Sequence, residues 1–111
     1  RHSTSAVFPA QIQDCNQAIA YLYQYADQYA LDKNKFVVMG FSAGAHLASL
    51  VGLAANQRVN EFYIGEVNPI KIKAVVDFYG PVHLLMFHAN QTPVTPHDPI
   101  TMLLGASPLL R

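Results

Sequence analysis

A serine stands between two glycines near the middle of this sequence, in the run Gly40-Phe41-Ser42-Ala43-Gly44. The run fits the pattern G-x-S-x-G, in which a serine is held on a sharp turn between a strand and a helix with its hydroxyl exposed. A helix that begins at this turn presents unpaired N–H groups and the positive end of its dipole where an oxyanion would form. We therefore predict Ser42 as a nucleophile and the Ala43 N–H as one oxyanion donor.

The two flanking glycines follow from the same geometry. We expect a Cβ at Gly40 or Gly44 to collide with neighbouring backbone where the chain doubles back. Strain at such a turn costs about 1–3 kcal/mol and persists where function requires it. A five-residue match also arises by chance, as a small-residue turn between a strand and a helix. The apolar run before the motif and the alanine-rich run after it favour the nucleophile turn.

A serine nucleophile needs a base, and the base needs a group that orients it. Because His46 follows Ser42 by four residues on the expected helix, its ring should point away from the hydroxyl. Asp77, near the end of a predicted strand, fits either an acid of the site or a residue that orders the following loop, and we favour the second. Scattered histidines without paired spacing argue against a metal site. The other histidines fall in loops, and nothing in their spacing distinguishes them from solvated ones: His83, His88 and His97.

Hydrophobic periodicity predicts the elements around the turn. An apolar stripe at steps of three and four predicts a helix over Pro9–Tyr29 along one face of a sheet. The strand Phe36–Phe41 lacks polar alternation, so we expect it to be buried on both faces in a parallel sheet. A second strand over Lys71–Gly80 completes a βαβ unit. Asn56–Pro69 is predicted as a surface loop, and Asp98–Leu104 as a short helix followed by a capping glycine.

The helix after the turn has two kinds of small and apolar positions. The predicted inner face consists of Leu47, Leu50, Val51 and Ala54. Close approach to neighbouring elements is expected at Ala45, Ala48, Gly52 and Ala55.

Composition restricts the class of protein. The 111 residues allow one domain at most, and seven acidic residues balance seven basic ones. Without a basic cluster, nucleic acid and anionic membranes are disfavoured as partners. There is no visible signal peptide, which slightly favours the cytoplasm, and no apolar run of about 18 residues that would predict a membrane span. Cys15 fits a buried structural thiol, and Asn90-Gln91-Thr92 is a formal glycosylation sequon.

Four segments together resemble the esterase and lipase branch of the α/β-hydrolase fold. The similarity is greatest to microbial feruloyl and acetyl-xylan esterases and to relatives of hormone-sensitive lipase. It implies a three-layer α/β-hydrolase domain, here with only part of its sheet. The segments are Phe8-Pro9-Ala10-Gln11, the run Gly40 to Ala48, the run Val75 to Pro81 and the run Leu103 to Pro108.

Members of that branch are well over twice as long, and they place an oxyanion loop before the serine and the acid and histidine after it. None of these has a matching position here, so residues 1–111 are predicted to be an internal segment of one such domain, inactive alone. We expect a carboxylesterase that acts on a small-molecule ester without a cofactor. The alternatives are an amidase, acyltransferase or peptidase on the same fold, and a non-catalytic module that keeps the turn as architecture. The sequence does not indicate an oligomeric state.

Overall fold

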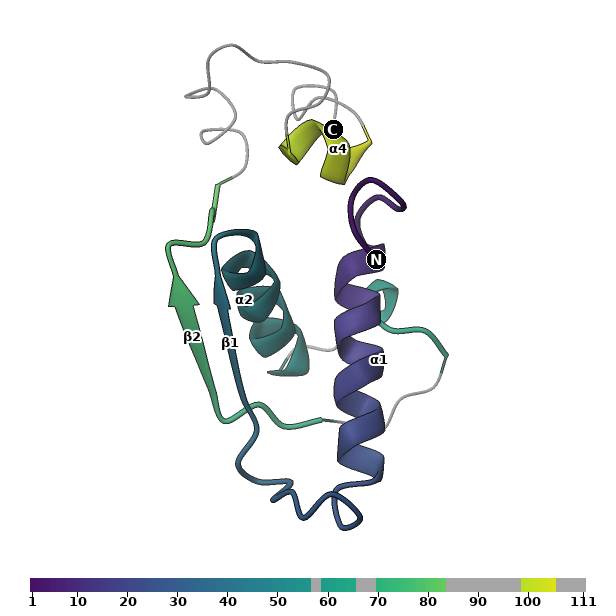
Figure 1. The fold of residues 1–111 in the computed structure, drawn as a ribbon, viewed down its shortest axis with the longest axis vertical. Helices are drawn as coiled ribbons and strands as arrows, with labels where there is room; N and C mark the ends of the chain where they lie inside the picture. Colours follow the sequence, from purple (N-terminus) through teal and green to yellow (C-terminus); the bar gives the residue numbers. More distant parts are fainter. Residues whose placement is uncertain (57–58, 66–69, 84–98, 106–111) are drawn as a thin grey trace.

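Two parallel strands and the helix that connects them form the centre of the molecule. The computed structural model describes residues 1–56, 59–65, 70–83 and 99–105. The elements follow the order helix, strand, helix, short 3-10 helix, strand and helix (Figure 1). Their bounds are α1 Ala10–Gln24, β1 Val37–Phe41, α2 Ala43–Asn56, η1 Asn60–Phe62, β2 Ala74–Phe78 and α4 Pro99–Leu104.

The two strands pair in parallel along their whole length. Val37 lies opposite Ala74 and Phe41 lies opposite Phe78, so both strands end at the same level of the sheet. Because α2 carries the chain from one strand to the next, the predicted βαβ unit is confirmed. Both strands are shorter than predicted, beginning one and three residues later than expected.

Small side chains let α2 lie close to the sheet. The buried positions on the helix are Ala45, Ala48, Val51, Gly52 and Ala54. A Cβ on Gly52 would lie 2.2 Å from Cγ2 of Val75, which confirms close approach there. The predicted inner face was partly wrong, because Leu47 and Leu50 are only half-buried. Mostly small residues therefore occupy the buried positions of α2, and the bulkier leucines keep part of their surface exposed.

The other face of the sheet is exposed in the part of the chain that the structure describes. Val37, Met39 and Phe41 alternate with the residues that face α2, and Met39 is 62% exposed. The prediction that this strand is buried on both faces was therefore wrong for the described residues. The helices α1 and α2 both lie on the same side of the sheet (Figure 1), so a single layer of helices covers one face of the sheet.

Helix α1 packs beside α2 and against η1. The sequence predicted instead that this helix would lie along one face of the sheet. It begins at Ala10, with Pro9 as its N-cap residue, and regular helix ends at Gln24 rather than Tyr29. The following turns end at Ala30, which has a φ of 54°. The Leu31 N–H then bonds the Ala26 carbonyl at 2.8 Å, the closure typical of a helix end with a left-handed residue.

Side-chain amides of α1 hold the segment 59–65, which the sequence predicted only as a loop. Gln13, Asn16 and Gln17 donate to the backbone carbonyls of three residues of that segment at 2.8, 2.9 and 3.0 Å. Asn16 is fully buried. These amides satisfy carbonyls that would otherwise need water, so the loop follows the helix.

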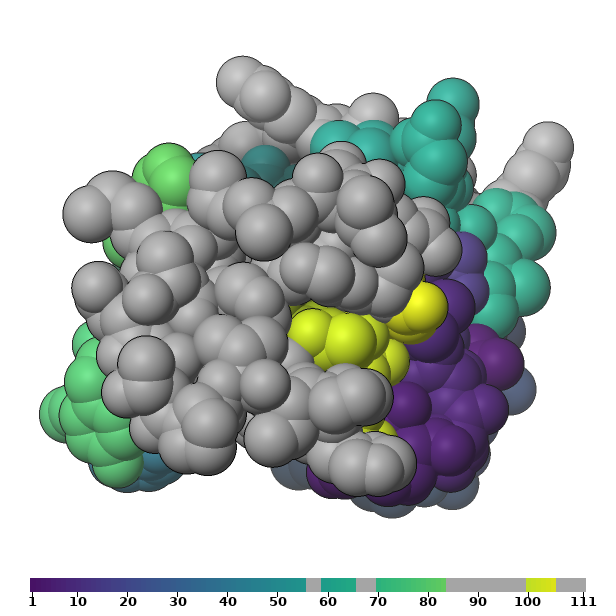
Figure 2. Space-filling model, turned by 90° about the horizontal axis from the view of Figure 1, so that it is seen from above, coloured from purple at the N-terminus to yellow at the C-terminus, as the bar shows by residue number. Residues whose placement is uncertain are grey.

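Helix α4 lies against the N-terminal segment. The Phe8 N–H donates to the Leu103 carbonyl at 2.7 Å, and Figure 2 shows the yellow helix directly beside the purple start of the chain. Gly105 has a φ of 75°, as expected for the glycine after a helix end. The predicted helix start at Asp98 lies outside the described residues. No described helix is long and apolar enough to cross a membrane.

Candidate active site

Ser42 occupies a strained turn between β1 and α2. It follows the last residue of β1, precedes the first residue of α2, and has a φ of 53°. Its N–H donates to the Phe78 carbonyl at 3.0 Å, and its carbonyl accepts from the His46 N–H at 3.1 Å. The residue is exposed, and its hydroxyl bonds no other side chain among the described residues. An exposed serine in this rarely populated conformation is the geometry that a nucleophile turn requires.

The two glycines of the turn differ in their surroundings. A Cβ on Gly40 would lie 2.1 Å from the carbonyl oxygen of Gly44 and 2.6 Å from the Ala45 nitrogen. A Cβ on Gly44 would meet no described atom within 4 Å outside its chain neighbours and the nearby backbone of its own helix. The predicted collision therefore holds at Gly40 and was wrong at Gly44. As the chain doubles back, Gly44 presents its carbonyl group to β1, while its own Cα faces open space.

Ala43 is the first residue of α2 and lies next to Ser42. The first N–H groups of a helix have no carbonyl partner within it. The helix dipole adds partial positive charge at the same end. This end of α2 therefore provides hydrogen-bond donors beside the serine hydroxyl.

Asp77 lies on β2 opposite Gly40, and its carboxylate faces α2. One oxygen accepts from the Ser49 hydroxyl at 2.7 Å, and the other accepts from the Gly80 N–H at 2.8 Å. The Ser49 bond, followed by the Gly80 bond, holds the pKa of Asp77 below its usual value. Of the two roles predicted for Asp77, these contacts correspond to ordering of the following loop.

The histidine ring of His46 lies near this carboxylate. Burial lowers the pKa of His46 from its usual value, and the charge of Asp77 opposes that effect. The ring makes no hydrogen bond to Ser42, in agreement with the expectation that it points away. His83 is exposed beyond β2, and His88 and His97 lie outside the described residues. Within the ranges that the structure describes, no group of three His, Cys, Asp or Glu residues is placed to hold a metal ion.

Aromatic residues end both strands beside Ser42. The rings of Phe41 and Phe78 stack with centroids 4.6 Å apart and planes 9° from parallel. Tyr79 follows Phe78 with a φ of 51°, and its ring centroid lies 6.2 Å from that of Phe41. Ser42 and Tyr79 thus occupy equivalent positions, each one residue past the end of its strand. Neither Tyr79 nor Ser49 was predicted from the sequence as part of this region.

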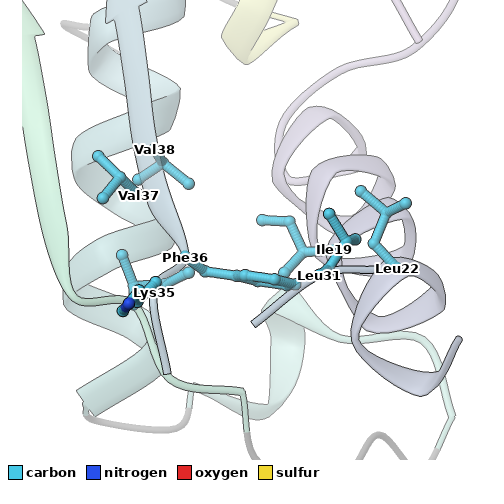
Figure 3. A pocket seen from close by; sticks show the side chains of 8 residues that line it. Ile19, Leu22, Leu31, Lys35, Phe36, Val37 and Val38 are labelled. Carbon is cyan, nitrogen blue, oxygen red and sulfur yellow. The ribbon is translucent and has the colours of Figure 1, made fainter. Parts of the chain in front are cut away.

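An apolar pocket of about 270 Å³ lies at the opposite end of β1 from Ser42 (Figure 3). It lies between α1, the start of β1 and the segment before β2, and Lys35 contributes its one charged side chain. Its apolar residues are Ile19, Leu22, Leu31, Phe36, Val37, Val38 and Ile72. Since parallel α/β sheets place ligands at the carboxyl ends of their strands, this pocket is not the candidate active site.

A parallel βαβ unit with a strained serine between the first strand and the helix defines the class of α/β hydrolases. Within that class, the chain belongs to the BD-FAE family, whose model matches residues 1–111. The resemblance to an esterase branch of this fold is thereby confirmed.

Two relatives of known sequence are named as ester hydrolases. Over 73 residues the chain is 37% identical to Esterase LipC of Mycobacterium tuberculosis (strain ATCC 25618 / H37Rv), which covers 66% of this chain and 18% of that protein. Over 81 residues it is 35% identical to the Probable carboxylic ester hydrolase LipM of the same organism, covering 72% of this chain and 18% of that protein. The chain therefore aligns with less than one fifth of each relative.

Two solved structures share the fold over nearly the whole chain. A bifunctional GH43-CE protein of Bacteroides eggerthii superposes with a TM-score of 0.79 at 30% identity, covering 96% of this chain and 16% of that one. A truncated form of a carbohydrate esterase from gut microbiota gives a TM-score of 0.72 at 34% identity, covering 95% of this chain and 41% of that one. The predicted α/β fold class is confirmed.

Proposed function

We propose that this chain is the nucleophile-bearing segment of a carboxylic ester hydrolase, with Ser42 as the nucleophile. The observation that carries this proposal is the left-handed backbone of Ser42, exposed between the end of β1 and the first turn of α2. A non-glycine residue pays for this conformation in free energy, so the surroundings must hold it. Its family and its esterase relatives support the same chemistry.

In the proposed reaction, Ser42 Oγ attacks the ester carbonyl while a histidine accepts the hydroxyl proton. The carbonyl oxygen becomes an oxyanion, which the Ala43 N–H helps to bind. Collapse of the tetrahedral intermediate expels the alcohol with a proton from the histidine, and water then releases the acid from Ser42. The proposed role of Gly40 and Gly44 is to form the turn that presents the hydroxyl, and no cofactor takes part.

The substrates that we propose are acylated carbohydrates. This part of the proposal rests on the two structural neighbours, one titled as a carbohydrate esterase and the other as a bifunctional GH43-CE protein, with identities of 34% and 30%. The partner of the site is then a small ester carried by a sugar. Release of acetate from an acetylated oligosaccharide should exceed hydrolysis of a matched anilide, which an amidase or peptidase would prefer.

A fluorophosphonate probe tests the nucleophile in the full-length enzyme that contains this segment. We expect labelling of the parent protein, loss of labelling in Ser42→Ala, and unchanged labelling in Ser5→Ala as a matched exposed serine. An unlabelled parent protein, or a labelled Ser42→Ala variant, would contradict the assignment and favour a non-catalytic module.

We further propose that residues 1–111 form an internal part of one α/β-hydrolase domain and do not catalyse hydrolysis alone. No described histidine ring bonds the Ser42 hydroxyl, and the relatives that the chain matches are several times longer. Removing a general base of this kind costs about 10⁶-fold in rate. Turnover of p-nitrophenyl acetate by the 111-residue chain, abolished in Ser42→Ala, would refute the proposed inactivity while supporting the nucleophile.

A further inference from the structure

We infer that Asp77 is a positioning residue for Ser42, and that it acts through the turn after β2 and through α2. The inference rests on the proposed role of Ser42 as a nucleophile. It arises from a closed set of hydrogen bonds around the serine, to which Asp77 contributes two.

The first connection runs through the backbone after β2. The Ser42 N–H is fixed by the Phe78 carbonyl at 3.0 Å. That carbonyl belongs to the peptide that leads into Tyr79, a residue with a φ of 51°. The turn continues to Gly80, whose N–H is held by Asp77 Oδ1 at 2.8 Å. The carboxylate therefore ties down the far side of the strained turn that supplies the acceptor for Ser42.

The second connection runs through the helix. Asp77 Oδ2 accepts from the Ser49 hydroxyl at 2.7 Å, two turns along α2 from the nucleophile. The same helix contacts the serine at its start, where the His46 N–H bonds the Ser42 carbonyl at 3.1 Å. A single carboxylate thus joins the turn after β2 to the helix whose first N–H groups face the reacting carbonyl.

Close packing around Gly80 couples the turn after β2 to the first turn of α2. A Cβ at Gly80 would lie 2.9 Å from the Cβ of Ala45 and 2.9 Å from both carboxylate oxygens of Asp77. The turn after β2 is therefore in direct contact with the first turn of α2. Loss of the carboxylate removes the hydrogen bonds that fix this contact, and displacement of the turn would move the Phe78 carbonyl and Ser42 together.

The geometry also separates this role from that of a triad acid. Both oxygens of Asp77 already accept hydrogen bonds, and an amide in place of the carboxylate keeps one acceptor and exchanges the other for a donor. In Asp77→Asn, Oδ1 can still accept from the Gly80 N–H and Nδ2 can donate to the Ser49 oxygen. Replacement of a triad acid by its amide costs about 10⁴-fold in kcat, whereas a positioning residue should tolerate it.

The experiment compares variants of the full-length enzyme by fluorophosphonate labelling rate and by p-nitrophenyl acetate kinetics, each normalised to folded protein. Displacement of a reacting group by about 1 Å costs about 10²-fold in rate. We therefore expect Asp77→Ala to lower the labelling rate and kcat by about 10²-fold with KM changed less than about twofold. Asp77→Asn should retain activity within about tenfold, and Asp27→Ala, an exposed aspartate without a side-chain bond among the described residues, should match the parent protein.

Ser49→Ala keeps the inference testable if Asp77→Ala does not fold. It removes one of the two connections, and we expect a loss of labelling rate between those of the two Asp77 variants. Unchanged rates per folded molecule in Asp77→Ala, or in Ser49→Ala if the former does not fold, would overturn the inference and leave only a structural role. A loss of about 10⁴-fold in Asp77→Asn would overturn it in favour of a triad acid. An unlabelled parent protein would instead refute the proposed nucleophile, so the two failures are distinguishable.

Discussion

Alanine at Gly40 tests whether the nucleophile turn depends on the absence of one side chain. The added Cβ would lie 2.1 Å from the Gly44 oxygen and 2.2 Å from the Gly44 carbonyl carbon. Ordinary contact begins at 3.4 Å, so the first turn of α2 must move away by about 1.3 Å. Both atoms are backbone, and no side-chain rotation can relieve the contact. We expect a loss of about 1–3 kcal/mol in unfolding free energy and about 10²-fold in Ser42 labelling rate.

Gly44→Ala provides the matched control within the same motif. Apart from its chain neighbours and the nearby backbone of its own helix, its Cβ meets no described atom within 4 Å, and its φ is not positive. Alanine in a helix is more favourable than glycine by up to about 1 kcal/mol, so stability should stay equal or rise. Urea denaturation of the full-length enzyme measures the stability, and fluorophosphonate labelling measures the serine. Equal behaviour of the two alanine variants, in either direction, would refute the account of why this turn contains glycine.

Three further predictions concern packing, protonation and the buried amide. Gly52→Ala should destabilise the protein by about 1–3 kcal/mol, because its Cβ would lie 2.2 Å from Cγ2 of Val75; Val75→Ala should restore part of the loss in a double-variant denaturation experiment. Burial lowers the pKa of His46 in the folded protein, so the unfolded state binds the histidine proton more tightly. The free energy of unfolding should therefore decrease as the pH falls below about 6.5. NMR titration should show a lowered pKa for His46, and His46→Gln should make the stability less sensitive to acid. Asn16→Ala should lower the free energy of unfolding by about 1–3 kcal/mol, because the Phe62 carbonyl loses its donor at 2.9 Å. Proteolysis near Phe62 should become faster, and the Ser42 labelling rate should stay unchanged.

The turn at Ser42 and its two strands could be predicted because their signals are local. An apolar run, a glycine-flanked serine and an alanine-rich run are consecutive in the sequence, and each has a separate conformational preference. The parallel pairing followed from the length of the connection between the strands. The prediction at Gly44 failed because a sequence motif names both glycines without saying which atoms of each face the neighbouring backbone.

Other features could not be predicted because they join distant residues or backbone groups. Ser49 and Asp77 are 28 positions apart, and neither has a pattern that indicates the other. The α1 amides bind backbone carbonyls, which have no sequence signature. The apolar stripe of α1 continued past its end at Gln24 because Ala26 remains buried after regular helix stops. Periodicity reports burial, and here burial extends beyond the helix.

The turn at Ser42 and the catalytic base differ in how they depend on the rest of the protein. Two backbone hydrogen bonds hold the left-handed conformation of Ser42, from residues of β2 and α2 that belong to this segment. The strain is therefore balanced locally, and the turn should form wherever β1, α2 and β2 assemble. A base must reach the hydroxyl within about 2.6–3.2 Å, and no described histidine does so. The proposed nucleophile geometry is thus a property of this segment, whereas activity depends on residues brought to it by other parts of the fold.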